Sequence, residues 1–216
     1  MIKCIILGGG GHTKGLLDTI KEANTDYHIE GILDPDIEKR GDSLLGINVI
    51  GDDELLPDFL AKGVRHFIVG LGGAGDCKPR MRLFNHAIEL GFKPLSIIHP
   101  SSYISSFASI GNGLQVMPHV SVMPGARIFD NVIINTGAIV EHDCMINSHS
   151  HISSGAHLAG NVSVGICSHL GIGSVVKQDI KIGDFVLVGA GAVVVKDISD
   201  NQTVVGNPAK KLEKTV

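Results

Sequence analysis

The stretch VIINTGAIVEHDCMINSHSHISSGAHLAGNVSVGICSHL, residues 132–170, decides the fold, because a branched aliphatic residue recurs in it at every sixth position. The same spacing runs from Ile98 to Val194, over seventeen consecutive positions, and stops at Asp200. Four places after each aliphatic comes a small or aliphatic residue, for example Cys144. A fixed period of six is the signature of a parallel β-helix and fits neither an α-helix nor simple alternation.

Each six-residue unit is expected to form a short strand and a corner, so that three units close one triangular coil around the inward-pointing aliphatics. Seventeen units make nearly six coils, a rod of roughly 25 Å at the usual spacing of paired strands. Residues eighteen apart should therefore lie one above the other, about 5 Å apart along the axis. Glycine directly follows the aliphatic at several corners, where a crowded or positive-φ backbone tolerates little else: Gly111, Gly165, Gly171, Gly183 and Gly189.

The composition narrows the class of protein. The chain has 216 residues, enough for one large or two small domains, and a formal net charge of −4 that offers no basic footprint for nucleic acid. The apolar start of the chain is too short for a signal or membrane segment, so a cytoplasmic location is expected. The four cysteines have no spacing typical of zinc or of a disulfide framework, and all are expected to be reduced: Cys4, Cys77, Cys144 and Cys167.

The N-terminal part alternates apolar runs with helical patterns. Strands are predicted over residues 2–7, 28–33, 66–71 and 95–98, and helices over residues 14–23, 53–62 and 80–90. This alternation predicts a small α/β, Rossmann-like, doubly wound domain over residues 1–97. The repeat domain follows over residues 98–216 without a long linker, and its segment 204–210 is expected to cap the open end of the prism.

Ligands of doubly wound domains bind beyond the carboxyl ends of the strands. Here that edge carries glycines and a histidine after the first strand, a carboxylate after the second and a glycine after the third: Gly10, Gly11, His12, Asp34 and Gly72. The glycines let backbone N–H groups approach a phosphate, and Asp34 can accept hydrogen bonds from a ribose or sugar hydroxyl. The loop lacks a clean G-x-G-x-x-G pattern, which favours a nucleotide-linked ligand over NAD. Alternatively, the glycine-rich turn only packs helix on strand.

The tripeptide Glu141-His142-Asp143 is the strongest candidate for proton transfer. Flanking carboxylates can orient a histidine and raise its basicity, as a general base near neutral pH requires. Gly160 follows His142 by eighteen residues, so its backbone N–H is expected one coil above, where it could stabilise an oxyanion during acyl transfer. Cys144 falls in an inward slot, a poor place for a nucleophile. The alternative is a solvated corner with incidental charges.

His151 and His169 are also eighteen residues apart and are expected to stack. Two stacked imidazoles could bind a metal, contact an acyl donor or lie at a subunit interface. A metal is the least favoured of these, because no carboxylate or cysteine accompanies the histidines at ligand spacing.

An ordered set of motifs resembles the PglD/NeuD family of sugar acetyltransferases over essentially the whole chain. The motifs are GGGGH at 8–12, ILDPD at 32–36, HPSS at 99–102, NTGAIVEHDC at 135–144, HISSGAHLAGNV at 151–162 and VVGNPAKKL at 204–212. The resemblance implies a left-handed β-helix, a homotrimer with the coenzyme between neighbouring prisms, and a role in polysaccharide biosynthesis. It also implies transfer of an acetyl group from acetyl-CoA to an amino group of a nucleotide-linked aminodideoxy sugar, or to a hydroxyl in the sialic acid branch.

Carried onto matching positions, the resemblance implies roles for individual residues. His142 is the implied catalytic base, tuned by Asp143. The implied acetyl-CoA contacts are His151, Gly160, Ile172 and Ala190, the last two being expected within a few residues of the column through His142 and Gly160. The implied sugar-nucleotide contacts are Gly10, Gly11, His12, Asp34, Gly72 and Asn135. The glycine run at 8–11 and Gly73 depart from the family pattern and leave the identity of the nucleotide open.

The leading hypothesis is therefore an N-acetyltransferase that needs acetyl-CoA and no metal. Three alternatives stay open: an O-acetyltransferase of a sialic acid-type sugar, a metal-dependent hydratase of the carbonic anhydrase type, and a non-catalytic sugar-nucleotide sensor.

Overall fold

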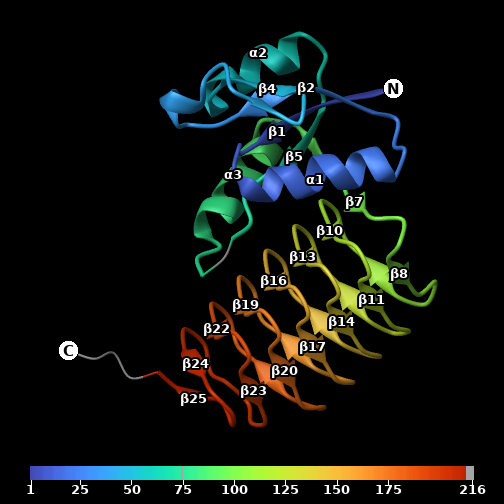
Figure 1. The fold of residues 1–216 in the computed structure, drawn as a ribbon, viewed down its shortest axis with the longest axis vertical. Helices are drawn as coiled ribbons and strands as arrows, with labels where there is room; N and C mark the ends of the chain where they lie inside the picture. Colours follow the sequence, from blue (N-terminus) through green and yellow to red (C-terminus); the bar gives the residue numbers. More distant parts are fainter. Residues whose placement is uncertain (74, 213–216) are drawn as a thin grey trace.

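The computed structural model describes residues 1–73 and 75–212, which form an α/β part and a triangular prism (Figure 1). The α/β elements are β1 (Ile2–Leu7), α1 (Gly11–Glu22), β2 (Tyr27–Leu33), η1 (Ile37–Lys39), β3 (Ser43–Leu44), β4 (Ile47–Gly51), η2 (Asp53–Leu55), α2 (Leu56–Ala61), β5 (His66–Val69), α3 (Lys78–Glu89) and β6 (Lys93–Pro94). The sheet order is β3-β4-β2-β1-β5-β6, and only the β3–β4 pair is antiparallel. No helix in the described residues is long and apolar enough to cross a membrane.

The central strand β1 contributes side chains to two hydrophobic cores. Ile6 packs with Leu16 of α1 on one face of the sheet. Leu7 packs with Phe67 of β5 and Phe84 of α3 on the other face. Because helices cover both faces, successive side chains of β1 are apolar instead of alternating. The loops after β1, β2 and β5 consequently share one edge of the sheet, where the sequence predicts a ligand site.

The remaining strands build the three faces of a left-handed prism. The first face is β7 (Ile97–Ile98), β10 (Gln115–Val116), β13 (Ile133–Ile134), β16 (His151–Ile152), β19 (His169–Leu170), β22 (Leu187–Val188), β24 (Thr203–Val205) and β25 (Lys210–Lys211). The second face is β8 (Tyr103–Ile104), β11 (Ser121–Val122), β14 (Ile139–Val140), β17 (His157–Leu158), β20 (Val175–Val176) and β23 (Val193–Val194). The third face is β9 (Ser109–Ile110), β12 (Arg127–Ile128), β15 (Met145–Ile146), β18 (Ser163–Val164) and β21 (Lys181–Ile182).

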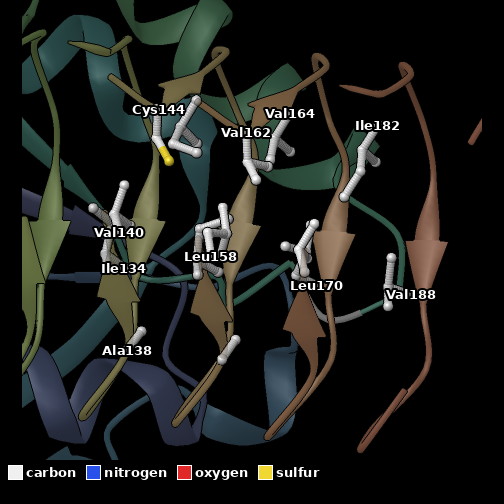
Figure 2. Packing of buried hydrophobic residues seen from close by; sticks show 14 of the residues in the cluster. Ile134, Ala138, Val140, Cys144, Leu158, Val162, Val164, Leu170, Ile182 and Val188 are labelled. Carbon is white, nitrogen blue, oxygen red and sulfur yellow. The ribbon is translucent and has the colours of Figure 1, made fainter. Parts of the chain in front are cut away.

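The coil register follows the predicted offset of eighteen residues. Val140 pairs with Leu158, and both side chains are at most 1% exposed. These side chains and that of Cys144 point into the prism (Figure 2). Burying one such aliphatic side chain stabilises the fold by about 1.5–3 kcal/mol, so the repeated column is the main source of cohesion between coils. The predicted fold class is confirmed.

The sequence offset between paired residues changes near the C-terminal end. Val188 of β22 pairs with Val204 of β24, sixteen residues later instead of eighteen. Asp200 interrupts the aliphatic series, and its carboxylate accepts a hydrogen bond from the Asp184 N–H at 2.9 Å. The chain then turns back, so that β25 pairs antiparallel with β24. Val204 is 4% exposed and closes the core, as the predicted cap requires.

Some predicted elements of the α/β part are wrong in extent. The apolar run at 95–98 is no single strand, because β6 ends at Pro94 in the α/β sheet and β7 begins at Ile97 in the prism. The predicted helix over 53–62 starts as the separate turn η2. The hairpin of β3 and β4 is missing from the sequence prediction, since its strands are short and carry polar residues.

Crowding, not positive φ, explains the glycines that follow the aliphatics. A Cβ on Gly171 would lie 2.6 Å from the Val188 carbonyl oxygen and 2.7 Å from the Ala190 nitrogen. Positive φ is found at other corner positions, for example 78° at Gly125 and 67° at Gly137. Crowding therefore explains Gly171, and positive φ explains Gly137.

The prediction that all four cysteines are reduced is wrong for two of them. Cys77, just before α3, forms a disulfide with Cys167 of the prism; the Cα atoms are 5.5 Å apart, and the sequence separation is 90. The sequence does not reveal this pair, because only the packing of the α/β part on the prism brings the two cysteines together. Cys4 and Cys144 carry buried thiols, and burial raises their pKa to about 12 and about 11.

Candidate active site

His142 and Asp143 form a hydrogen-bonded pair on the corner between β14 and β15. His142 Nδ1 lies 2.9 Å from Asp143 Oδ2, and the two side chains are 61% and 66% exposed. Asp143 has φ of 59°, a left-handed conformation that turns its carboxylate back toward the preceding imidazole. Because the carboxylate accepts a hydrogen bond from Nδ1–H, the Nε2 lone pair of a neutral His142 is directed away from Asp143 and is available to a proton donor.

The charge around His142 favours its protonated form. The hydrogen bond with Asp143 raises the pKa of His142 above its ordinary value, and desolvation opposes this effect. The carboxylates of Glu141 and Asp179 raise this pKa further. A histidine tuned in this way is a stronger base than a free imidazole, as the sequence predicts.

Gly160 lies directly over the imidazole, one coil above. A Cβ at this position would be 2.5 Å from both Cε1 and Nε2 of His142, so any side chain would displace the ring. The N–H of Gly160 has no hydrogen-bond partner among residues 1–73 and 75–212, whereas the next residue, Asn161, donates its N–H to the His142 carbonyl at 2.9 Å. The predicted neighbourhood of base and backbone donor is therefore present. A hollow of about 240 Å³ opens beside it, lined by His142, Gly160, Asn161, Gln178 and Asp179.

Cys144 lies close to this pair in sequence but faces the core. Its side chain is fully buried, and its thiol contacts the Ala159 carbonyl oxygen at 3.2 Å. Burial raises the pKa of the thiol to about 11, which keeps it protonated at neutral pH. The corner therefore offers a base without a thiolate nucleophile.

A second group of predicted residues meets where the α/β part packs on the first prism face. His12, at the start of α1, lies with Nε2 2.7 Å from Gln115 Oε1. Gln115 in turn donates its Nε2–H to the Val69 carbonyl at 2.6 Å, which leaves Oε1 to accept from His12. Gly72 is adjacent, since a Cβ on it would lie 3.5 Å from the Cβ of His12. Gln115 was outside the predicted site, because its role depends on a contact between parts 103 residues apart.

His151 and His169 stack as predicted. Their ring centroids are 4.9 Å apart with an interplanar angle of 17°. Gly75 donates its N–H to His169 Nδ1 at 2.8 Å, so the other nitrogen of a neutral His169 carries the proton and donates to Ser153 Oγ at 2.7 Å. Asn135 lies with Nδ2 3.3 Å from His151 Nε2. The stacked pair thus contacts the loop after β5 on one side and the predicted sugar-facing amide on the other.

Burial holds these histidines neutral. Burial, together with the neighbouring His169, His12 and Arg80, lowers the pKa of His151 to about 3. Burial likewise lowers the pKa of His12 to about 4, with the Gln115 contact opposing it. Within residues 1–73 and 75–212, no three His, Cys, Asp or Glu side chains converge as ligands of a metal ion would.

Asp34 lies at the predicted sheet edge, but its carboxylate already has several partners. Oδ2 accepts from the Gly9 N–H at 2.7 Å, Oδ1 from the Asp36 N–H at 3.0 Å, and Lys39 Nζ lies 3.1 Å from Oδ2. Burial alone would raise the pKa of Asp34, but these donors outweigh it and lower the pKa overall. Lys39 was not predicted, although it follows the Asp34-Pro35-Asp36 motif closely in sequence.

The glycine loop beside Asp34 is open. A Cβ on Gly10 or Gly11 would meet no described atom within 4 Å, and Gly10 is the N-cap of α1. A hollow of about 370 Å³ adjoins this edge; its lining includes Gly8, Asp34, Lys39, Leu71 and Arg82. The geometry suits an anionic ligand, because helix N-termini and lysine both favour negative charge.

The prediction that Ile172 and Ala190 lie near the His142 column is wrong within one chain. The corner between the second and third faces carries His142 and Gly160, whereas Ile172 and Ala190 lie on the corner between the first and second faces. Ile172 follows Gly160 by twelve residues, which is two-thirds of a coil and not a whole one. Both corners nevertheless border the same second face of the prism.

Fold and site together define the class of protein. A left-handed prism with an oriented histidine under a glycine, joined to an α/β domain with a phosphate-competent loop, is the architecture of a hexapeptide-repeat acetyltransferase. A family model described as the PglD N-terminal domain matches residues 3–87. A curated relative, GDP-perosamine N-acetyltransferase of Escherichia coli O157:H7, is 31% identical over 87 residues, which cover 40% of this chain and 39% of that protein's length.

Solved structures extend the match to the whole chain. Perosamine N-acetyltransferase from Caulobacter crescentus, a histidine variant in complex with CoA and GDP-perosamine, is 35% identical, with a TM-score of 0.92 over 98% of this chain and 97% of that one. The acetyltransferase domain of PglB from Neisseria gonorrhoeae, in complex with acetyl coenzyme A, is 38% identical, with a TM-score of 0.87 over 97% of this chain and 98% of that one. The chain belongs to the PglD/NeuD-type family of sugar acetyltransferases.

Proposed function

We propose that the protein transfers the acetyl group of acetyl-CoA to the amino group of a nucleotide-linked aminodideoxy sugar. The observation that carries this proposal is the His142–Asp143 pair lying under Gly160, whose N–H has no partner in the described part of the chain. Relatives of similar sequence include a GDP-perosamine N-acetyltransferase and structures holding CoA with GDP-perosamine. A GDP-linked amino sugar is therefore the first substrate to test.

In the proposed reaction, His142 Nε2 accepts a proton as the sugar amine attacks the thioester carbon. Asp143 stabilises the imidazolium that forms, because its carboxylate faces Nδ1–H. The carbonyl oxygen becomes an oxyanion, and the Gly160 N–H donates to it. Collapse of the tetrahedral species forms the amide and breaks the C–S bond, and the leaving thiolate takes the proton back from His142.

We further propose that the active site is shared between chains of a homotrimer. The base and oxyanion donor lie on one corner of the second face, and the proposed coenzyme contacts Ile172 and Ala190 lie on its other corner. If second faces pack around a threefold axis, one corner of each chain approaches the other corner of its neighbour. Apolar outward residues on this face support such packing, since Tyr103 is 56% and Val175 43% exposed.

The α/β domain, assigned to residues 1–97, would hold the nucleotide end of the substrate. Gly10 and Gly11 leave the start of α1 open to a phosphate. His12, which is neutral, and Gly72 lie toward the prism. There Asn135 would contact the sugar, and His151 would contact the acetyl group. A cytoplasmic location and a part in polysaccharide biosynthesis complete the proposal.

The proposal is tested by incubating the protein with acetyl-CoA and GDP-, UDP- or dTDP-linked amino sugars. We expect release of free CoA thiol together with an equal amount of N-acetylated sugar. Transfer only to a hydroxyl of a sialic acid would overturn the assigned acceptor. Binding of the sugar nucleotide without any thermal stabilisation by acetyl-CoA would instead indicate a sensor.

A further inference from the structure

Gly125 occupies the same corner as Asp143, one coil earlier. Both have a left-handed backbone, with φ of 78° and 59°, and the two residues above them, Asn161 and Asp179, share it with φ of 60° and 62°. Asp143 donates its N–H to the Pro124 carbonyl, nineteen residues earlier, at 3.1 Å, and Asn161 and Asp179 keep this offset. Gly125 donates its N–H to the Phe107 carbonyl, eighteen residues earlier, at 3.2 Å. The left-handed φ of this corner therefore recurs in successive coils, whereas the side chains at it differ.

A side chain at position 125 would occupy the space of the Asp143 carboxylate. A Cβ built on Gly125 would overlap Oδ1 of Asp143 and approach its Cγ to 3.3 Å. By contrast, a Cβ at Gly137, a left-handed glycine of another corner, would meet no described atom within 4 Å. Left-handed φ alone therefore explains Gly137, whereas Gly125 is also needed for space.

The carboxylate would move before the backbone does. The backbone around His142 is held by hydrogen bonds from Asp143 N–H to Pro124 and from Asn161 N–H to His142. The Asp143 carboxylate is 66% exposed and has His142 Nδ1 as its hydrogen-bond partner within the described residues. Rotation about the side-chain bonds of Asp143 is thus the easiest relief, and it breaks the contact with His142.

The same corner shows what a side chain beneath an aspartate does. Two coils above Gly125, Asn161 stands in its place and Asp179 in the place of Asp143. The Asn161 amide donates to Asp179 Oδ1 at 2.9 Å, so the carboxylate bonds to the coil beneath it. An asparagine at position 125 would offer the same amide to Asp143.

We propose that Gly125 is a positioning residue, whose missing side chain keeps the Asp143 carboxylate on His142. Together with Gly160, it confines the pair between two glycines, one beneath the carboxylate and one above the imidazole. This inference rests on the proposed role of His142 as the base. Gly125 acts through Asp143 and touches neither substrate nor coenzyme in this role.

The test compares Gly125→Asn and Gly125→Ala with matched Gly137→Asn and Gly137→Ala. Asparagine tolerates left-handed φ, so Gly125→Asn should fold, as the native asparagines at such corners show. We expect both Gly125 variants to lower kcat by about tenfold or more, in the range of a weakened general base. The pH at which activity falls on the acid side should also move lower, because loss of the Asp143 contact lowers the pKa of His142. Glu141 and Asp179 remain and still raise this pKa in the variants. The Gly137 variants should leave that pH unchanged.

A double substitution makes the test specific. Adding Gly125→Asn to Asp143→Asn should cause little further loss of kcat, because the contact has already been removed. Full additivity of the two losses, or a Gly125→Asn protein with the native pH profile, would overturn the inference. Normal turnover by His142→Ala would instead overturn the proposed function, so the two failures are distinguishable.

Discussion

The corner with His142 and the junction, where the α/β part packs on the first prism face around His12 and His151, shift the pKa of histidine in opposite directions. At the corner, the hydrogen bond with Asp143 and the nearby carboxylates raise the pKa of His142. At the junction, burial lowers the pKa of His151 to about 3 and of His12 to about 4. The comparison shows that burial and neighbouring charge, and not residue type, separate a histidine suited to proton transfer from histidines suited to neutral hydrogen bonding.

The largest expected effect is on turnover when the corner loses its base. His142→Ala should lower kcat by about 10²-fold or more, because the hollow beside Gly160 loses the imidazole that would take the proton from the amine. The fold should be preserved, since the side chain is 61% exposed. Steady-state rates and far-UV circular dichroism check this prediction. Substitution of His12 to Ala, if it caused the same loss of kcat with unchanged KM, would assign proton transfer to the junction instead.

Asp143→Asn should have a smaller effect, with a distinct pH signature. The amide cannot balance an imidazolium, so the pKa of His142 falls toward its ordinary value and kcat falls by about tenfold. Because activity needs the neutral base, a lower pKa moves the acid limb of the rate profile to lower pH. A profile of kcat between pH 5 and 8 measures this shift, and a limb that moves to higher pH would contradict it.

At the junction, pH should act on stability. His12 has a pKa of about 4 in the folded protein and about 6.5 when unfolded, so its contribution is fully present above pH 6.5 and is lost as the pH falls toward 4. At pH 5.5 this loss amounts to about 1 kcal/mol. Thermal unfolding as a function of pH should therefore show a weaker acid dependence for His12→Asn. His86→Asn, at an exposed site on α3, is the control and should retain the native dependence.

The smallest expected effect on turnover concerns the disulfide at the junction. Alkylation of the denatured, unreduced protein should label two of its four cysteines, Cys4 and Cys144. A Cys77→Ser, Cys167→Ser protein should unfold at lower temperature, because the closed loop no longer restricts the unfolded chain. Its kcat should change little, since the corner with His142 is stabilised by its own coils. Labelling of all four cysteines without reductant would show that the pair is not bonded.

The prism could be predicted closely because its contacts join residues at fixed offsets in the sequence. A period of six fixed which residues point inward, and the offset of eighteen placed Gly160 over His142 and His169 on His151. The same arithmetic would also have found Gly125, eighteen residues before Asp143. It failed for Ile172 and Ala190 only where an offset of twelve was treated as a whole coil.

Sequence by itself determined the coil, its register and the base with the glycine above it, since every one of these depends on contacts between residues a fixed number of positions apart. Tertiary structure alone decided the junction. The contacts of His12 with Gln115, of Gly75 with His169 and of Cys77 with Cys167 join parts that no repeat relates. Their partners depend on how two separately folded surfaces fit together, and that fit has no periodic signal in the chain.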